Sequence, residues 1–172
     1  MSQWSKHLPA QHRLASWLSA GGSLTAHIRR VGHDFRVSRL SQHCGLSLPE
    51  ESATLSRQRG VVVREVLLME GNTPLVFAHS VVAQRDTCGA WRAVRGLGSR
   101  PLAELLFADR DVSRQPLQYR IVTATDPLGR RILRALPQLR FPLWARRSVF
   151  RKHGVPLLVT EVFLPAITEW QP

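Results

Sequence analysis

Two segments of the chain are apolar runs of the length of a β-strand, and each carries one ion on a strand face that is otherwise apolar. Arg64 lies in VVVREVLLM and Glu161 lies in PLLVTEVFLP. Residues two apart share a strand face, and the neighbours on these faces are all apolar: Val62, Val66 and Leu68 beside Arg64, and Leu157, Val159 and Phe163 beside Glu161. Breaking a buried ion pair costs roughly 3 to 5 kcal/mol. Each ion therefore needs a partner.

Two interpretations explain these ions. In the first they are structural: they bond to each other, or Arg64 pairs with Glu65 or Glu70 at a sheet edge. In the second they hold opposite ends of a small polar ligand that lies between a sheet and the helices covering it. The sequence leaves both interpretations open.

Length and composition predict one domain with a real core, because 172 residues at 44% hydrophobic content can bury one. No N-terminal stretch has the order of a secretory signal, and no apolar run approaches the roughly 20 residues needed to span a bilayer. We therefore expect a soluble, cytoplasmic protein. Cys44 and Cys88 lie in no CxxC motif and are expected as reduced thiols, with one bridge left open.

The net charge of +12 comes almost entirely from arginine. Such a charge attracts nucleic acid, acidic lipid headgroups or an anionic metabolite. The arginines are dispersed, and most of the few aromatic residues fall in apolar patterns, which does not favour a nucleic-acid surface. We expect most of the arginines on the solvated surface and a minority that steer an anionic substrate inward.

Six segments are expected as strands: residues 35–42, 60–70, 75–83, 116–124, 143–152 and 156–165. Gly71-Asn72 and His153-Gly154 join neighbouring strands by tight turns. Helices are expected at residues 10–20, 24–32 (capped by Ser23), 86–94 (capped by Asp86 or Thr87) and 101–109, with a turn or short helix at 126–137. Residues 46–56 are expected as a loop. The predicted class is α+β: a mainly antiparallel six-stranded sheet with helices on one face and a ligand pocket between the sheet and the helices and flap loops.

From about Trp17 to Pro165 the chain resembles the chorismate lyase family. The resemblance rests on the order and spacing of several motifs: WL...S[ML]T at 17–25, REVLL at 64–68 with the following P...VV strand, LG..PL..LLF at 97–107, LWARRS at 143–148 and PLL.TE.FLP at 156–165. It implies a single domain over residues 1–172 with short tails at both ends.

The resemblance also implies a function and a set of site residues. In that family chorismate gives 4-hydroxybenzoate and pyruvate for ubiquinone biosynthesis, without cofactor or metal. Arg64 corresponds to the arginine that holds the ring carboxylate, and Glu161 to the carboxylate that contacts the ring hydroxyl. Leu24 and Leu102 occupy positions whose backbone amides bind the ligand carboxylate; well-known relatives have Met at the position of Leu24.

The residue types suit these roles. A guanidinium forms a planar fork that matches a carboxylate, and an amide at a helix start lacks an intrahelical partner. A second cation is needed for the enolpyruvyl carboxylate, and the candidates are Arg120, Arg146 and Arg147. Because neighbours on a strand point to opposite faces, at most one of Arg146 and Arg147 faces inward.

A non-catalytic sensor is the main alternative, since a similar fold serves as the effector-binding domain of some bacterial transcription regulators. Only about twenty residues precede the matched region, too few for the DNA-binding domain that such regulators carry. We expect a monomer with chorismate as its partner and no nucleic acid. His79, on an alternating strand, is expected as a core or surface residue and not as a metal ligand.

Overall fold

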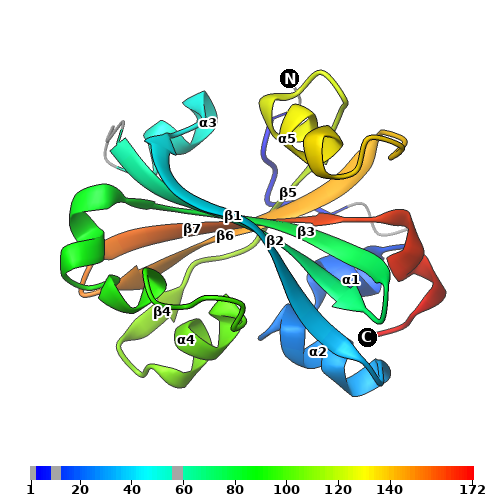
Figure 1. Ribbon diagram of the computed structural model, residues 1–172, viewed down its shortest axis with the longest axis horizontal. Helices are drawn as coiled ribbons and strands as arrows, with labels where there is room; N and C mark the ends of the chain where they lie inside the picture. Colours follow the sequence, from blue (N-terminus) through cyan, green and yellow to red (C-terminus); the bar gives the residue numbers. More distant parts are fainter. Residues whose placement is uncertain (1–2, 9–12, 56–59) are drawn as a thin grey trace.

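One antiparallel sheet organises the chain in the computed structural model, which describes residues 3–8, 13–55 and 60–172 (Figure 1). In these ranges the sheet has seven strands: β1 (Phe35–Leu46), β2 (Gly60–Glu70), β3 (Thr73–Ala83), β4 (Val112–Arg114), β5 (Gln118–Val122), β6 (Leu143–Lys152) and β7 (Val155–Phe163). The order across the sheet is β1-β2-β3-β7-β6-β4, and β5 also pairs with β6. The antiparallel α+β class is confirmed.

The two predicted hairpins form as expected. Gly71, with φ +55°, turns β2 into β3, while His153 (φ 49°) and Gly154 (φ 79°) turn β6 into β7. A positive φ has a low conformational energy only for glycine and for a few other residues in tight turns. The bounds of β2 and β6 are those read from the sequence. β2 is buried along nearly its whole length, and β6 alternates buried and half-buried residues over most of its length.

The structure has one strand more than the six expected, the three-residue β4. Two further expectations are wrong. Residues 46–56 were predicted to hold no element, yet α3 (Pro49–Ser52) lies there, with Glu51 Oε2 accepting from the Leu48 amide at 2.8 Å; residue 56 lies outside the described ranges. The helix predicted at 86–94 is instead two 3₁₀ turns, η1 (Gln84–Cys88) and η2 (Arg92–Val94).

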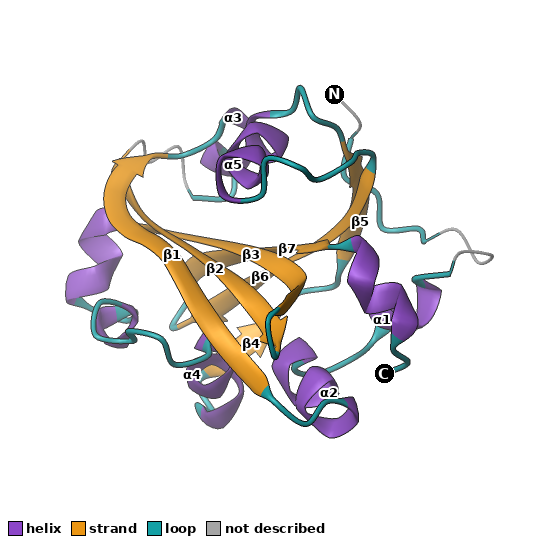
Figure 2. Ribbon diagram, turned by 45° about the vertical axis from the view of Figure 1, so that its right-hand side comes forward, coloured by secondary structure: helices purple, strands orange, loops and turns teal. Residues whose placement is uncertain are grey.

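Helices cover both faces of the sheet (Figure 2), so the expectation of helices on one face is wrong. On the face of Arg64 lie α1 (Ala15–Ser19), α2 (Leu24–Val31) and α4 (Leu102–Ala108). The last two lie at the predicted helix positions. α1 is shorter than the helix predicted at 10–20, of which residues 10–12 lie outside the described ranges. Their apolar side chains join those of the sheet in two core clusters: Leu18, Leu24 and Ile28 with Val66 and Leu68, and Leu102 and Leu106 with Val62 and Phe150. This face is the one that carries the predicted site.

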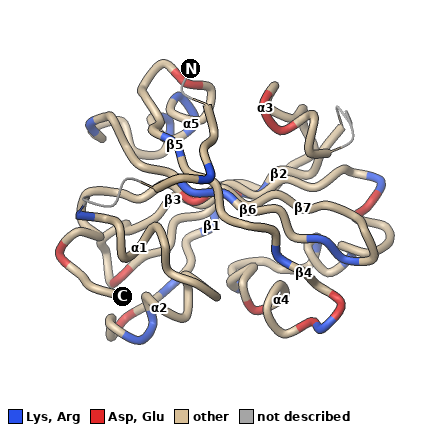
Figure 3. Tube along the Cα trace, turned by 180° about the vertical axis from the view of Figure 1, so that it is seen from behind, with Lys and Arg blue, Asp and Glu red and all other residues tan. Residues whose placement is uncertain are grey.

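The opposite face is covered by α3 and by α5 (Pro127–Ala135), where Leu128 and Ile132 pack against Leu67 and Phe77. The last element is the 3₁₀ turn η3 (Pro165–Glu169). Lys and Arg positions are spread over strands, helices and loops (Figure 3), as the sequence predicted. Within the described ranges, every helix is too short or too polar to cross a membrane.

Candidate active site

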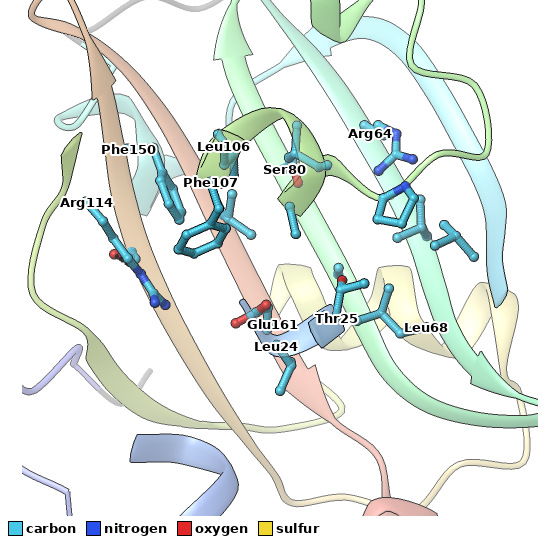
Figure 4. Close-up of a pocket in the computed structure, with 18 of the residues that line it drawn as sticks. Leu24, Thr25, Arg64, Leu68, Ser80, Leu106, Phe107, Arg114, Phe150 and Glu161 are labelled. Carbon is cyan, nitrogen blue, oxygen red and sulfur yellow. Dashed lines mark hydrogen bonds between the residues drawn. The ribbon is translucent and has the colours of Figure 1, made fainter. Parts of the chain in front are cut away.

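A pocket opens between the sheet and the helices α2 and α4, and Arg64 and Glu161 both line it (Figure 4). Its volume is about 570 Å³ including the mouth that opens to solvent. The walls are mostly apolar and come from the sheet and the two helices: Val66, Leu68, Ala78, Val159, Phe150, Leu24, Leu102, Leu106 and Phe107. A mostly apolar pocket with a few polar groups is typical of a small-molecule site.

Arg64 is buried, with 2% of its surface exposed. Its Nη2 donates to the carbonyl oxygens of Gly98 at 3.2 Å and Arg100 at 2.9 Å, while its buried Nε has no hydrogen-bond partner among the described residues. Burial, followed by the nearby charge of Arg39, lowers the pKa of Arg64 to about 10. The guanidinium is therefore still charged at neutral pH, and its charge is not neutralised by any carboxylate within the described chain.

Arg64 does not form a structural ion pair with any of the three carboxylates that the sequence suggested as its partner. Glu161 bonds to Arg146, and Glu65 bonds to His79 and to Arg131 on the other face of the sheet. Glu70 accepts from two backbone amides, those of His33 and Asp34. Arg64 is thus a buried cation that faces a cavity, which is the arrangement expected of a ligand-binding group.

Glu161 is held from behind by Arg146, whose Nε donates to its Oε2 at 2.6 Å. The Arg146 side chain is fully buried, and the Glu161 side chain is 16% exposed toward the pocket. Nη1 of the same guanidinium donates to the carbonyl oxygens of Trp17, Leu18 and Ala20, at 3.0, 3.3 and 2.9 Å. One buried arginine therefore fixes both the carboxylate and the chain segment that leads to α2.

Arg114, on the short strand β4, also lines the pocket, at the end opposite Arg64 (Figure 4). Its Nη1 donates to the Gly22 carbonyl at 2.8 Å, and its Nε donates to Ser148 Oγ at 3.2 Å. The guanidinium carbon lies 5.8 Å from the ring centre of Phe107 and 5.4 Å from that of Phe150, within the range of cation–π attraction. Sequence reasoning missed this residue, because three residues of strand show no period.

Two of the arginines predicted for the second carboxylate lie on the wrong face of the sheet. Arg120 is buried beside Glu50 and Asp126, at 3.0 and 3.4 Å. Arg147 stacks on the Trp4 ring at 4.3 Å. Arg146 does face the pocket side, as strand alternation allows for one of the two neighbours, but its Nε is taken by the carboxylate. Those three candidates are therefore not supported as ligands of the second carboxylate.

The starts of α2 and α4 bring Leu24 and Leu102 to the pocket wall. Ser23 caps α2 as predicted, with its Oγ accepting from the Ala26 amide at 3.2 Å. Pro101 was predicted at the first helical position but is the N-cap, so α4 begins one residue later, at Leu102. Amides in a first helical turn have no partner inside the helix, so both starts suit an anion next to them.

The comparisons with known proteins identify the family. A family model described as chorismate lyase matches residues 3–171. The chain belongs to the chorismate lyase family. A protein of Azoarcus sp. (strain BH72) named "Probable chorismate pyruvate-lyase" is 48% identical to this lyase over 92% of the chain and 87% of its own length. One of the same name from Nitrosospira multiformis is 45% identical over 91% and 89%.

Solved structures similar to this lyase show the same fold with little sequence identity. The C-terminal domain of PhnF has a TM-score of 0.61 at 14% identity and covers 92% of the chain and 94% of its own. The ligand-binding domain of a putative GntR-family transcriptional regulator from Bordetella bronchiseptica has a TM-score of 0.54 at 17% identity, over 77% and 86%. At such identities the likeness concerns the fold alone.

Behind its pocket, on the other face of the sheet, the lyase buries a second group of charges. His79 is 1% exposed; its Nδ1 lies 3.0 Å from Glu65 Oε1, and its Nε2 lies 3.0 Å from Glu51 Oε1, an ion-pair contact without hydrogen-bond geometry. Burial alone would lower the pKa of His79, but the two carboxylates raise it to about 9. His79 is a core residue, as predicted, and it holds α3 to the sheet.

Proposed function

We propose that the pocket binds chorismate with its ring between Arg64 and Glu161. The protein is a chorismate pyruvate-lyase, which cleaves a carbon–oxygen bond of chorismate to give 4-hydroxybenzoate and pyruvate for ubiquinone biosynthesis. The observation that supports the binding mode is that a cation and an anion, each on its own strand, face one apolar cavity without bonding to each other.

Arg64 binds the ring carboxylate in this proposal. The Nε of Arg64 has no hydrogen-bond partner among the described residues, and a carboxylate accepts from a guanidinium in bidentate fashion. Amides at the starts of α2 and α4, those of Leu24 and Leu102, complete the carboxylate site. Charge, donors and apolar walls then fit one end of a benzoate-like ring.

Glu161 orients the hydroxyl at the opposite end of the ring. The reaction breaks the bond between ring C3 and the ether oxygen, whose electron pair leaves with enolpyruvate, and the proton at C4 is lost as the ring becomes aromatic. Enolpyruvate gains a proton and becomes pyruvate, so all atoms of chorismate appear in the two products. Glu161, bonded to the C4 hydroxyl, is placed next to the proton that leaves. Positioning and charge stabilisation suffice, because aromatisation supplies the driving force.

The decisive experiment mixes the pure protein with chorismate and a metal chelator and measures both products. Equal amounts of 4-hydroxybenzoate and pyruvate are expected. Binding of chorismate or 4-hydroxybenzoate without turnover would overturn the proposal in favour of a sensor, the alternative that the fold likeness to transcription regulators raises.

Two variants test the residues. Arg64→Met should abolish detectable turnover, and Glu161→Gln, which keeps the side-chain shape, should lower kcat by about 100-fold or more. Arg39→Met is the matched control, because Arg39 lies close enough to act on the charge of Arg64 without lining the pocket. Near-normal kinetics in the folded Arg64 or Glu161 variant would remove that residue from the site.

We also propose that the enzyme works in the cytoplasm as a monomer and without nucleic acid. Cys44 and Cys88 are exposed free thiols, the state that a reducing compartment maintains. Light scattering at assay concentration should give the mass of one chain, and a stable dimer would contradict this.

A further inference from the structure

We propose that Arg114 binds the enolpyruvyl carboxylate of chorismate and so distinguishes the substrate from 4-hydroxybenzoate. The inference rests on the proposed function. Chorismate carries two carboxylates, one on the ring and one on the enolpyruvyl group, whereas 4-hydroxybenzoate carries the ring carboxylate alone. A pocket that binds chorismate therefore needs a second cation, and 4-hydroxybenzoate makes no use of it.

A row of paired residues that begins with Arg64 ends at Ser148, to which Arg114 is bonded, while the register partner of Arg114 itself is Phe150. Arg64 pairs with Ser80, Ser80 with Val159, and Val159 with Ser148, across the strands β2, β3, β7 and β6. All four residues line the pocket, and Ser148 Oγ accepts from Arg114 Nε at 3.2 Å. The two arginines thus close opposite ends of one row across the pocket floor.

Glu161 lies between these two ends, two residues along β7 from Val159 (Figure 4). Its strand is two positions from that of Arg64 and two from that of Arg114. Neighbouring strands are about 4.8 Å apart, so each arginine's backbone lies about 10 Å from that of the carboxylate. The enolpyruvyl group is attached next to the hydroxyl-bearing carbon of the ring. With the ring hydroxyl at Glu161, the second carboxylate points away from Arg64, toward Arg114.

The guanidinium of Arg114 is held in place and still has donors to offer. Its bonds to Gly22 and Ser148 use Nη1 and Nε, and no bond to Nη2 is found in the part of the chain that the structure describes. The rings of Phe107 and Phe150 fix its plane. A fixed fork with a free N–H edge is the geometry that binds a carboxylate with little loss of side-chain entropy.

Charges in the pocket match a dianion. Arg146 neutralises Glu161 from behind, which leaves the charges of Arg64 and Arg114 facing the cavity. Burial and the neighbouring Arg146 lower the pKa of Arg114, while Glu161 raises it. A carboxylate bound to Arg114 would therefore stabilise the charged form of a partly desolvated guanidinium. Two cations at two ends fit two carboxylates.

The test compares substrate with product in one variant. Arg114→Met should lower kcat/KM for chorismate by about 10- to 100-fold, the factor that one charge-assisted hydrogen bond is worth. The inhibition constant of 4-hydroxybenzoate should change by less than about 3-fold, because this ligand lacks the second carboxylate. Arg114→Lys, which keeps the charge, should recover part of kcat/KM. Arg110→Met, an exposed arginine in the segment before β4, should match the wild type.

Two results would overturn the inference. If the inhibition constant of 4-hydroxybenzoate rises in parallel with the loss of kcat/KM, Arg114 acts by holding Gly22 and not by binding the second carboxylate. If neither constant changes, Arg114 has no role. A variant that binds 4-hydroxybenzoate normally is folded by that measure, and should Arg114→Met not fold, Arg114→Lys carries the same comparison. Failure of the wild type to convert chorismate would refute the proposed function instead.

Discussion

Arg146 Nε donates to Glu161 Oε2 at 2.6 Å, and both side chains lie on the face of the sheet that carries the pocket. The same guanidinium bonds to three carbonyl oxygens of the segment from Trp17 to Ala20. That segment runs directly into Gly21 to Leu24, the loop that closes one side of the pocket. The carboxylate proposed to meet the substrate hydroxyl and the loop beside the pocket are thus held by one buried side chain.

Arg146→Met should therefore damage both stability and catalysis. Removing one partner of a buried ion pair costs about 3 to 5 kcal/mol, which urea unfolding measures. Arg146→Lys keeps the charge but not the position of the Nε donor, and its kcat should fall about 100-fold, the effect of a misplaced catalytic group. Arg147→Lys, on the other face of the same strand, is the matched control and should keep its kcat. An Arg146→Lys enzyme with wild-type kcat would contradict this account of Glu161.

Gly22 and Gly21 offer a matched pair of substitutions in the loop before α2. Gly22 has φ +68°, and neither glycine has an atom within 4 Å of an added Cβ. Left-handed backbone costs a non-glycine residue roughly 1 to 2 kcal/mol, so Gly22→Ala should shift the loop and lower kcat/KM about tenfold. Gly21→Ala should leave the kinetics unchanged. Equal kinetics in the two variants would show that the Gly22 conformation does not matter for the pocket.

The sequence predicted the site as far as its residues lie on regular strands. Arg64 and Glu161 stood out because a period of two marks the residue that breaks it, and the structure brings both to one pocket. Arg114 could not be found in this way. Its strand has three residues, and its burial comes from Phe107 and Phe150, which belong to other segments. Contacts between distant segments have no local signal.

The missed helix α3 has the same cause. Glu51 looks like a surface residue within a polar stretch, yet it is 2% exposed because it reaches the buried His79 on β3. Two of the three arginines proposed for the second carboxylate, Arg120 and Arg147, lie away from the pocket for a related reason. Alternation tells which residues share a face, but it does not tell which face carries the pocket; Arg120 and Arg147 meet Glu50 on the other one.

The buried His79 makes stability depend on pH. Its pKa is raised from 6.5 to about 9 by Glu51 and Glu65 against the effect of burial. Between these values the folded protein keeps a proton that the unfolded chain loses, so stability falls as pH rises. The slope of the free energy of unfolding should reach about 1.4 kcal/mol per pH unit. Urea unfolding between pH 6.5 and 9 measures this slope. In the His79→Gln variant the free energy of unfolding should hardly change with pH over this range. An equal slope in the variant would exclude His79 as the source.

Glu65, which bonds to His79 and Arg131, makes the protein less stable as pH falls in acid. Burial would raise the pKa of Glu65, but its bonds to His79 and the charge of Arg131 lower it from 4.5 to about 2. Its contribution to stability is complete above pH 4.5 and is lost as pH falls toward 2. Glu65→Gln should remove part of the acid sensitivity of the wild type in urea unfolding. If the variant loses stability with acid as steeply as the wild type, other carboxylates dominate.

Gly129, on α5, is packed too tightly for any other residue. A Cβ there would lie 2.0 Å from the Thr123 carbonyl oxygen, and that turn cannot move away, because Asp126 Oδ2 accepts from the Thr123 amide at 2.7 Å. Alanine normally stabilises a helix interior by about 0.5 to 1 kcal/mol relative to glycine. Here the sign is reversed, and Gly129→Ala should cost about 1 to 3 kcal/mol, as overpacking does.

Gly96→Ala is the control for this substitution, since an added Cβ at Gly96 meets no atom within 4 Å; it should be neutral or stabilise by up to about 1 kcal/mol. Because α5 packs on the face opposite the pocket, Gly129→Ala should keep its kcat per folded molecule. Thermal unfolding measures the change in stability, and an assay corrected for the folded fraction measures kcat per folded molecule. A Gly129→Ala protein as stable as the wild type would show that α5 can shift on the sheet, and a loss of kcat would show that such a shift reaches the site through the strands.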